Sequence, residues 1–108
     1  MSATAWLAQR RSAPPASLAE AVARYAAGRE AGDVPEQLAA AAMDALETAL
    51  ERPEDRAGAW DLLAADALLT YAFEAAAEEG AAAVERLAAA LGPDRFDRLL
   101  DDHSRGRT

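Results

Sequence analysis

The sequence contains no cysteine and no lysine, and its one histidine, His103, lies close to the carboxyl end. Without cysteine there are no disulfides, thiolate nucleophiles or cysteine-based zinc sites. Without lysine the loop G-x-x-x-x-G-K-[ST] cannot form, and the glycine pattern of dinucleotide-binding folds is also missing. A single histidine cannot supply the Glu-x-x-His pairs of di-metal bundles, and no Ser–His–Asp arrangement is recognisable. We therefore expect no enzymatic activity, no cofactor and no metal.

Residues that favour strands are also scarce, with three valines, no isoleucine and 6% aromatic residues. In contrast, alanine and leucine, which favour helices, account for 32 and 13 residues. The composition therefore predicts an all-α fold. Only 24 apolar residues are larger than alanine, so the core has little bulk. In small chains association often supplies the missing burial, and we expect a homodimer or a small protein partner.

No apolar run is long enough to cross a membrane, because the longest, at residues 62–73, is interrupted by Asp66 and Thr70. Residues 1–11 also lack the apolar stretch of a signal peptide. We therefore expect a cytoplasmic protein that makes no contact with membranes.

The net charge is −8, and the negative charge is concentrated in the middle of the chain. Residues 30–79 contain 13 acidic residues against only Arg52 and Arg56. Such a segment repels phosphate backbones, so we expect no nucleic-acid binding. The same charge permits an antitoxin-like role as the acidic partner of a basic protein, although solubility explains it equally well.

Helix-start and helix-stop residues divide the chain, which we expect to be one helical domain, into four to five helices with short connections. Residues 1–12 are expected to form an arm or short helix with Ser2 as its cap. Ser17 and Glu20 match a capping box, which predicts that the first full helix begins at Ser17. Gly32 is expected to end that helix.

Asp33 is expected to cap the next helix, with Pro35 in its first turn and Pro53 at its end. Its predicted buried face comprises Leu38, Ala42, Ala45, Leu46, Ala49 and Leu50. Its predicted solvent face comprises Gln37, Asp44, Glu47 and Glu51. A shorter helix follows Gly80, a last one spans about 94–102, and residues 103–108 are expected to form a disordered tail.

The longest helix is expected at about 54–79, and it is apolar on two sides. One stripe comprises Trp60, Leu63, Ala67 and Tyr71, and the other comprises Leu62, Leu69, Phe73 and Ala76. Apolar groups on two sides predict neighbours on two sides, so this helix should be the centre of a compact bundle. Trp60 and Tyr71 share a face, where they either pack in the core or anchor a partner.

A narrow polar line interrupts this helix, formed by Asp66, Thr70, Glu74 and Glu78 at spacings of four residues. The line is either the solvent-facing strip of the helix or a stripe that binds a ligand or partner through Asp66, Thr70 and Glu74. A third possibility is that Asp66 is partly buried and paired with an arginine or a helix N-terminus, because an unpaired buried carboxylate is costly.

Residues 62–74, which read LLAADALLTYAFE, resemble a core helix of isoprenyl diphosphate synthases, where a similar G-D-A-L-L-T-x-A-F-E phrase occurs. Ala65 stands in place of the family's glycine. The aspartate-rich D-D-x-x-D motifs that hold magnesium in that family are absent, since Asp101-Asp102 lacks the third aspartate. The family's basic diphosphate-binding motif is absent too. The resemblance therefore implies shared helix packing, or a non-catalytic accessory subunit of such an enzyme.

Two functional hypotheses follow. The first is a non-enzymatic helical module that acts by protein–protein contact or self-association. The second is a ligand-binding or accessory role that uses Asp66, Thr70 and Glu74.

Overall fold

The computed structural model describes residues 1–10, 14–51, 56–92 and 101. Within these ranges the chain has five helices and no strand, which confirms the all-α prediction. The helices are α1 (Ala3–Ala8), α2 (Ala16–Ala26), α3 (Val34–Glu51), α4 (Arg56–Glu79) and α5 (Ala81–Ala90). The last helix and the tail predicted from the sequence lie outside the described residues, apart from Asp101.

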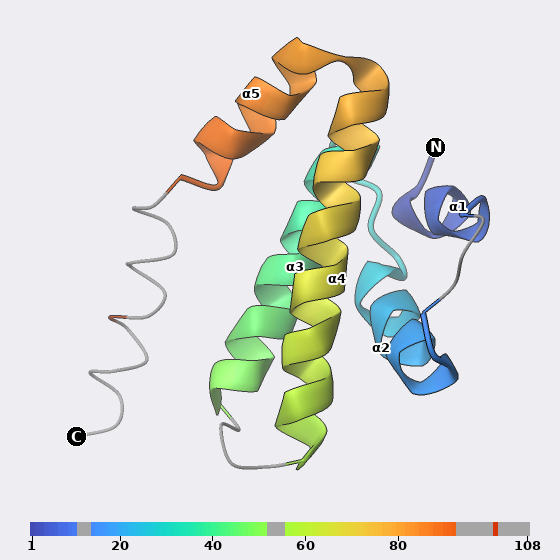
Figure 1. Cartoon of the computed structure of the whole chain (residues 1–108), viewed down its shortest axis with the longest axis vertical. Coiled ribbons are helices and arrows are strands. Elements are labelled where there is room, and N and C mark those ends of the chain that lie inside the picture. Colours follow the sequence, from blue (N-terminus) through green and yellow to red (C-terminus); the bar gives the residue numbers. More distant parts are fainter. Residues whose placement is uncertain (11–13, 52–55, 93–100, 102–108) are drawn as a thin grey trace.

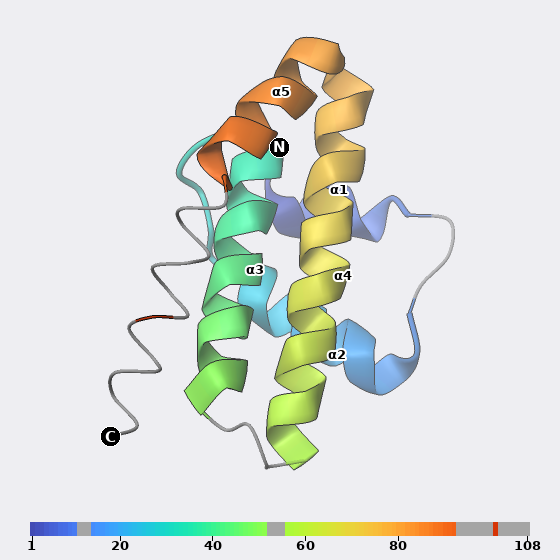
Figure 2. The same cartoon turned by 60° about the vertical axis from the view of Figure 1, so that its left-hand side comes forward.

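The two longest helices, α3 and α4, form an antiparallel pair that is the centre of the bundle (Figure 1). The helices α1 and α2 lie on one side of this pair, and α5 turns back at Gly80 to lie beside the start of α3 (Figure 2). As expected, α4 is one continuous helix, and it packs against α2, α3 and α5. No described helix combines the length and the apolar character needed to cross a bilayer.

The core is built mainly from alanine, as the composition requires. Of the 21 buried apolar residues in the described ranges, 14 are alanines. The largest fully buried side chains are Leu38 on α3 and Leu68 on α4. With such small side chains between them, α3 and α4 lie close enough for van der Waals contact to replace bulk.

The predicted helix caps are partly confirmed. The Ser2 hydroxyl accepts a hydrogen bond from the Ala5 amide, and Asp33 caps α3 by accepting one from the Glu36 amide at 2.9 Å. The capping box at Ser17 is wrong, because α2 begins at Ala16 with Pro15 at the cap and no side-chain cap bond. The fixed backbone of proline starts the helix before the serine is reached.

The predicted end of this helix at Gly32 is also wrong. Helix α2 ends at Ala26, and both Gly28 (φ 75°) and Gly32 (φ 83°) adopt left-handed conformations in the connection to α3. A Cβ atom at Gly32 would lie 2.4 Å from Glu36 Oε2. The Glu36 side chain can move away from such an atom, so it is the positive φ that favours glycine at position 32, in the connection between α2 and α3.

The solvent face predicted for α3 is correct for its acidic residues and wrong for Gln37, whose exposed fraction is only 3%. Its side-chain oxygen accepts a hydrogen bond from the Ala3 amide at 2.8 Å, and its nitrogen donates one to the Gly32 carbonyl at 3.0 Å. Gln37 thus satisfies the buried Ala3 amide and also binds the Gly32 carbonyl in the connection before α3. The start of α3 is covered by α1, which the periodicity of α3 alone could not show.

Candidate functional site

The amino-terminal half of α4 carries three large apolar side chains that remain exposed. Trp60 is 39% exposed, Leu62 53% and Leu63 48%, and together we call them the α4 apolar patch. Apart from Met1, they are the exposed large hydrophobic residues of the described part of the chain. This half of α4 has the predicted neighbours on two sides, α2 and α3, but they leave Leu62 and Leu63 exposed.

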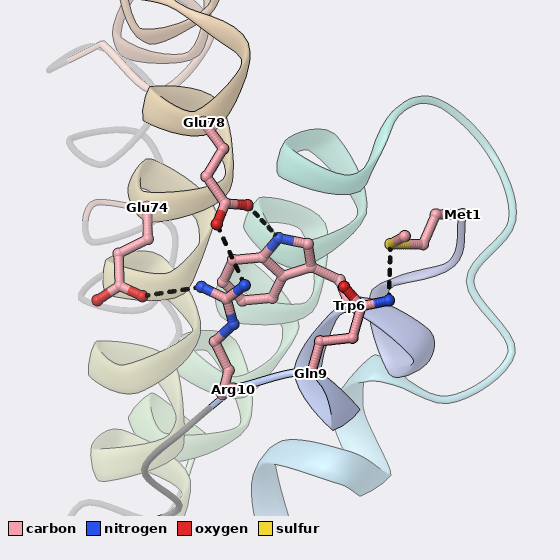
Figure 3. Close-up of polar contacts among 6 residues, drawn as sticks. All are labelled: Met1, Trp6, Gln9, Arg10, Glu74 and Glu78. Atoms are coloured by element: carbon pink, nitrogen blue, oxygen red, sulfur yellow. Dashed lines mark hydrogen bonds and ion pairs between the residues drawn. The ribbon is translucent and has the colours of Figure 1, made fainter.

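The carboxyl-terminal half of α4 is covered by α1 (Figure 3). Trp6, only 4% exposed, packs edge-to-face on Tyr71 with ring centroids 5.9 Å apart. The Trp6 indole N–H donates to Glu78 at 2.7 Å, and the Arg10 guanidinium lies 3.7 Å from the Trp6 ring centroid. Tyr71 is thus partly buried against the core, whereas Trp60 stays at the surface.

The residues of the polar line of α4 differ in their exposure and in their hydrogen-bond partners. Asp66 is exposed to solvent, and the Thr70 hydroxyl donates to the Asp66 carbonyl of its own helix at 3.0 Å. Glu74 lies 3.9 Å from Arg10, and Glu78 accepts a hydrogen bond from Arg10 at 3.1 Å. Its hydrogen bonds, first from Trp6 and then from Arg10, lower the pKa of Glu78 below 4.5. The carboxyl end of the line therefore holds α1 in place.

The structure brings Asp66, Thr70 and Glu74 to one exposed face but into no common cavity. Asp66 borders a shallow hollow of about 180 Å³ whose other lining residues are apolar side chains of α3 and α4, among them Met43 and Leu62. Within the described ranges no cluster of acidic or histidine side chains could hold a metal ion. A ligand site on this stripe stays a prediction.

A buried carboxylate that the sequence reasoning missed lies one residue after Trp60. Asp61 is 4% exposed, and its Oδ1 accepts a hydrogen bond from the Tyr25 hydroxyl at 2.7 Å and lies 3.7 Å from the Arg24 guanidinium. Burial, together with the hydrogen bond to Asp61, raises the pKa of Tyr25 above 10.0. One signal was available, since Asp61 shares the helical spacing of the buried Ala65 and Leu68.

Asp61 lies in a hollow of about 580 Å³ between α2, α3 and α4. Its polar lining comprises Ser17, Glu20, Arg24, Tyr25, Thr48 and Asp61. Trp60 also lines it, so the hollow adjoins the α4 apolar patch. A volume of this size is in the range of small-molecule sites.

Comparisons with protein-family models, curated proteins and solved structures gave no match for the chain. The resemblance of residues 62–74 to a helix of isoprenyl diphosphate synthases is untested by these comparisons and stays a prediction.

Proposed function

We propose that the protein is a non-enzymatic helical module that acts by protein–protein contact, and that it forms a homodimer through the α4 apolar patch. The observation that carries this proposal is the exposure of Trp60, Leu62 and Leu63 on a helix whose other large apolar side chains are at least partly covered. Exposed large apolar side chains are typical of protein contact sites. Trp60 and Leu62 lie on either side of Leu63, because successive residues of a helix are about 100° apart.

The face of α4 that runs through Leu63, the middle residue of the patch around the helix, is self-complementary, so a second copy of the chain can bind it. Arg56, Leu63, Ala67 and Glu74 follow one another at spacings of seven, four and seven residues, which places them on one face of the helix. When two α4 helices pair antiparallel about residue 65, Leu63 faces Ala67 of the other copy. Arg56 then faces Glu74 of that copy, and the symmetry repeats both contacts.

The size of the patch sets the expected strength of this dimer. Each of its side chains is about half exposed, so burying one contributes on the order of 1 kcal/mol. The loss of translational and rotational freedom on association offsets much of the total from two copies. We therefore expect reversible association, with a Kd between micromolar and millimolar.

Analytical ultracentrifugation over a wide concentration range tests the proposal. The wild-type chain should shift from monomer towards dimer, and the double variant Leu62→Gln, Leu63→Gln should remain monomeric with unchanged circular dichroism. Ala88→Gln, at an exposed position of α5, is the matched control and should dimerise like the wild type. A strict monomer at hundreds of micromolar, or an unaffected double variant, would show that the proposal is wrong.

A further inference from the structure

We propose that the hollow between α2, α3 and α4 binds a small organic cation of the alkylammonium or guanidinium class, with Asp61 holding the charge and Trp60 flanking it. This site adjoins the dimer surface and shares Trp60 with it, whereas Leu62 and Leu63 do not line the hollow. Three features carry the inference: the unused acceptor capacity of Asp61, the net charge of the hollow and its aromatic walls.

The Asp61 carboxylate is almost fully buried, yet its contacts within the described residues use one oxygen only. Both the Tyr25 hydroxyl and the Arg24 guanidinium approach Oδ1. An ionised carboxylate can accept about four hydrogen bonds through its two oxygens. Asp61 therefore has capacity for further donors, and an ammonium or guanidinium group presents several.

The charge of the hollow favours a cation. Glu20 and Asp61 are opposed by Arg24 alone, and the Arg24 side chain is 67% exposed. A charge in solvent at 3.7 Å neutralises a buried carboxylate poorly, because water screens it. The Tyr25 hydroxyl donates to Asp61 and adds no negative charge. A cation that contacts Asp61 directly would supply the countercharge that Arg24 supplies only in part.

The walls of the hollow suit an organic cation better than a metal ion. Trp60 and Tyr25 both line the hollow, and aromatic rings attract cations through their quadrupole. Arg24 already uses this interaction, since its guanidinium carbon lies 5.6 Å from the centroid of the Tyr25 ring. Ala21 adds an apolar surface for an alkyl stem.

Nuclear magnetic resonance of the two indole N–H groups tests this site, with Trp60 as the reporter and the buried Trp6 as an internal control. The Trp60→Phe variant assigns the two resonances. At constant ionic strength, n-butylammonium and n-butylguanidinium should each move the Trp60 resonance saturably and leave that of Trp6 in place. n-Butanol and n-butyrate have a similar alkyl group but no positive charge, and they should cause no saturable shift. Equal shifts with n-butanol would overturn the proposal.

Variants then identify the group that holds the charge. Asp61→Asn keeps an oxygen for the Tyr25 hydroxyl but removes the charge, so the affinity should fall about tenfold. Asp66→Asn makes the same change on an exposed part of α4 and should alter the affinity less than about twofold. If both variants weaken binding of the cation equally, Asp61 is not the residue that binds its charged group.

A third variant keeps the test decisive if Asp61→Asn does not fold. Arg24→Gln removes the competing cation from a largely exposed position, so binding of both probes should tighten. A loss of affinity in this variant would contradict the proposal. Repeating the titrations on Leu63→Gln separates ligand binding from dimerisation, because that residue lies outside the hollow.

Discussion

The two halves of α4 are both rich in apolar residues but have different surroundings. The carboxyl-terminal half is covered by Trp6 and Arg10, which reach it from the amino-terminal segment. The amino-terminal half leaves Trp60 and two leucines exposed. An apolar stripe thus shows that a helix face can be covered, but the covering segment depends on the rest of the chain or on a partner.

The largest effect is expected from removing the side chain that covers the carboxyl-terminal half of α4. Trp6→Ala removes a buried aromatic side chain and the indole donor to Glu78, so the free energy of unfolding should fall by about 3–5 kcal/mol. Trp60→Ala, the matched change on the exposed half, should cost about 1 kcal/mol or less. Urea unfolding followed by circular dichroism measures both. Similar losses would show that Trp6 does not fasten α1 to the bundle.

A smaller effect is expected where the exposed half of α4 meets α2. Tyr25→Phe leaves the buried Asp61 without its hydroxyl donor and should destabilise the chain by about 1–3 kcal/mol. Tyr71→Phe, in the covered half, keeps the ring that packs on Trp6 and should change stability by less than about 0.5 kcal/mol. The same urea unfolding experiment compares the two. Equal effects would mean that the hydrogen bond to Asp61 contributes nothing to stability.

The acid dependence of stability tests the contact that covers the carboxyl-terminal half of α4. The folded-state pKa of Glu78 is lowered, so its contribution is present above pH 4.5 and is lost as the pH falls through the folded value. Glu78→Gln should therefore flatten the pH profile of the melting temperature in this acidic range. Its neighbour Glu79 is exposed, and Glu79→Gln should retain the wild-type slope. A wild-type slope in Glu78→Gln would show that the contacts with Trp6 and Arg10 are absent in solution.

Periodicity and composition were enough to predict the helices, because alanine and leucine leave no competing strand. They located α3, the continuous α4 and the caps at Ser2 and Asp33 within a few residues. They failed where proline geometry or tertiary contact decides, as at Ser17 and at the buried Gln37. Local sequence cannot show that α1 covers the start of α3, and that contact is the reason Gln37 is buried.

The candidate sites were predictable only in part, for the same reason. The sequence indicated Trp60 and Tyr71 as one face of α4, but not that Trp6 would cover Tyr71 and leave Trp60 exposed. Asp66 lies inside the longest apolar run and Asp61 lies just before it, so the apolar run indicated Asp66 and not Asp61. A carboxylate at the spacing of buried residues is the better signal of an interior polar group than one surrounded by apolar neighbours in sequence.

The smallest expected effect concerns Asp66, at the boundary between the halves. Antiparallel pairing about residue 65 brings the two Asp66 side chains of a dimer near each other, where like charges repel. Asp66→Asn should therefore tighten dimerisation about two- to fivefold at low salt, and less in high salt because screening already weakens the repulsion. The unfolding free energy of the monomer should change by less than about 0.5 kcal/mol, since the side chain is exposed.

Sedimentation at two salt concentrations measures this effect, and Glu85→Gln on α5 controls for the change in net charge. If both variants tighten the dimer equally, the repulsion arises from overall charge and the antiparallel register is wrong. If Asp66 instead belongs to a ligand-binding stripe with Thr70 and Glu74, diphosphate with Mg²⁺ should raise the melting temperature of the wild type but not of Asp66→Asn. If Asp66 lies only at a dimer contact, diphosphate with Mg²⁺ should not produce this difference. Comparing the wild type with Asp66→Asn therefore distinguishes a contact surface from a ligand-binding site on the same face of α4.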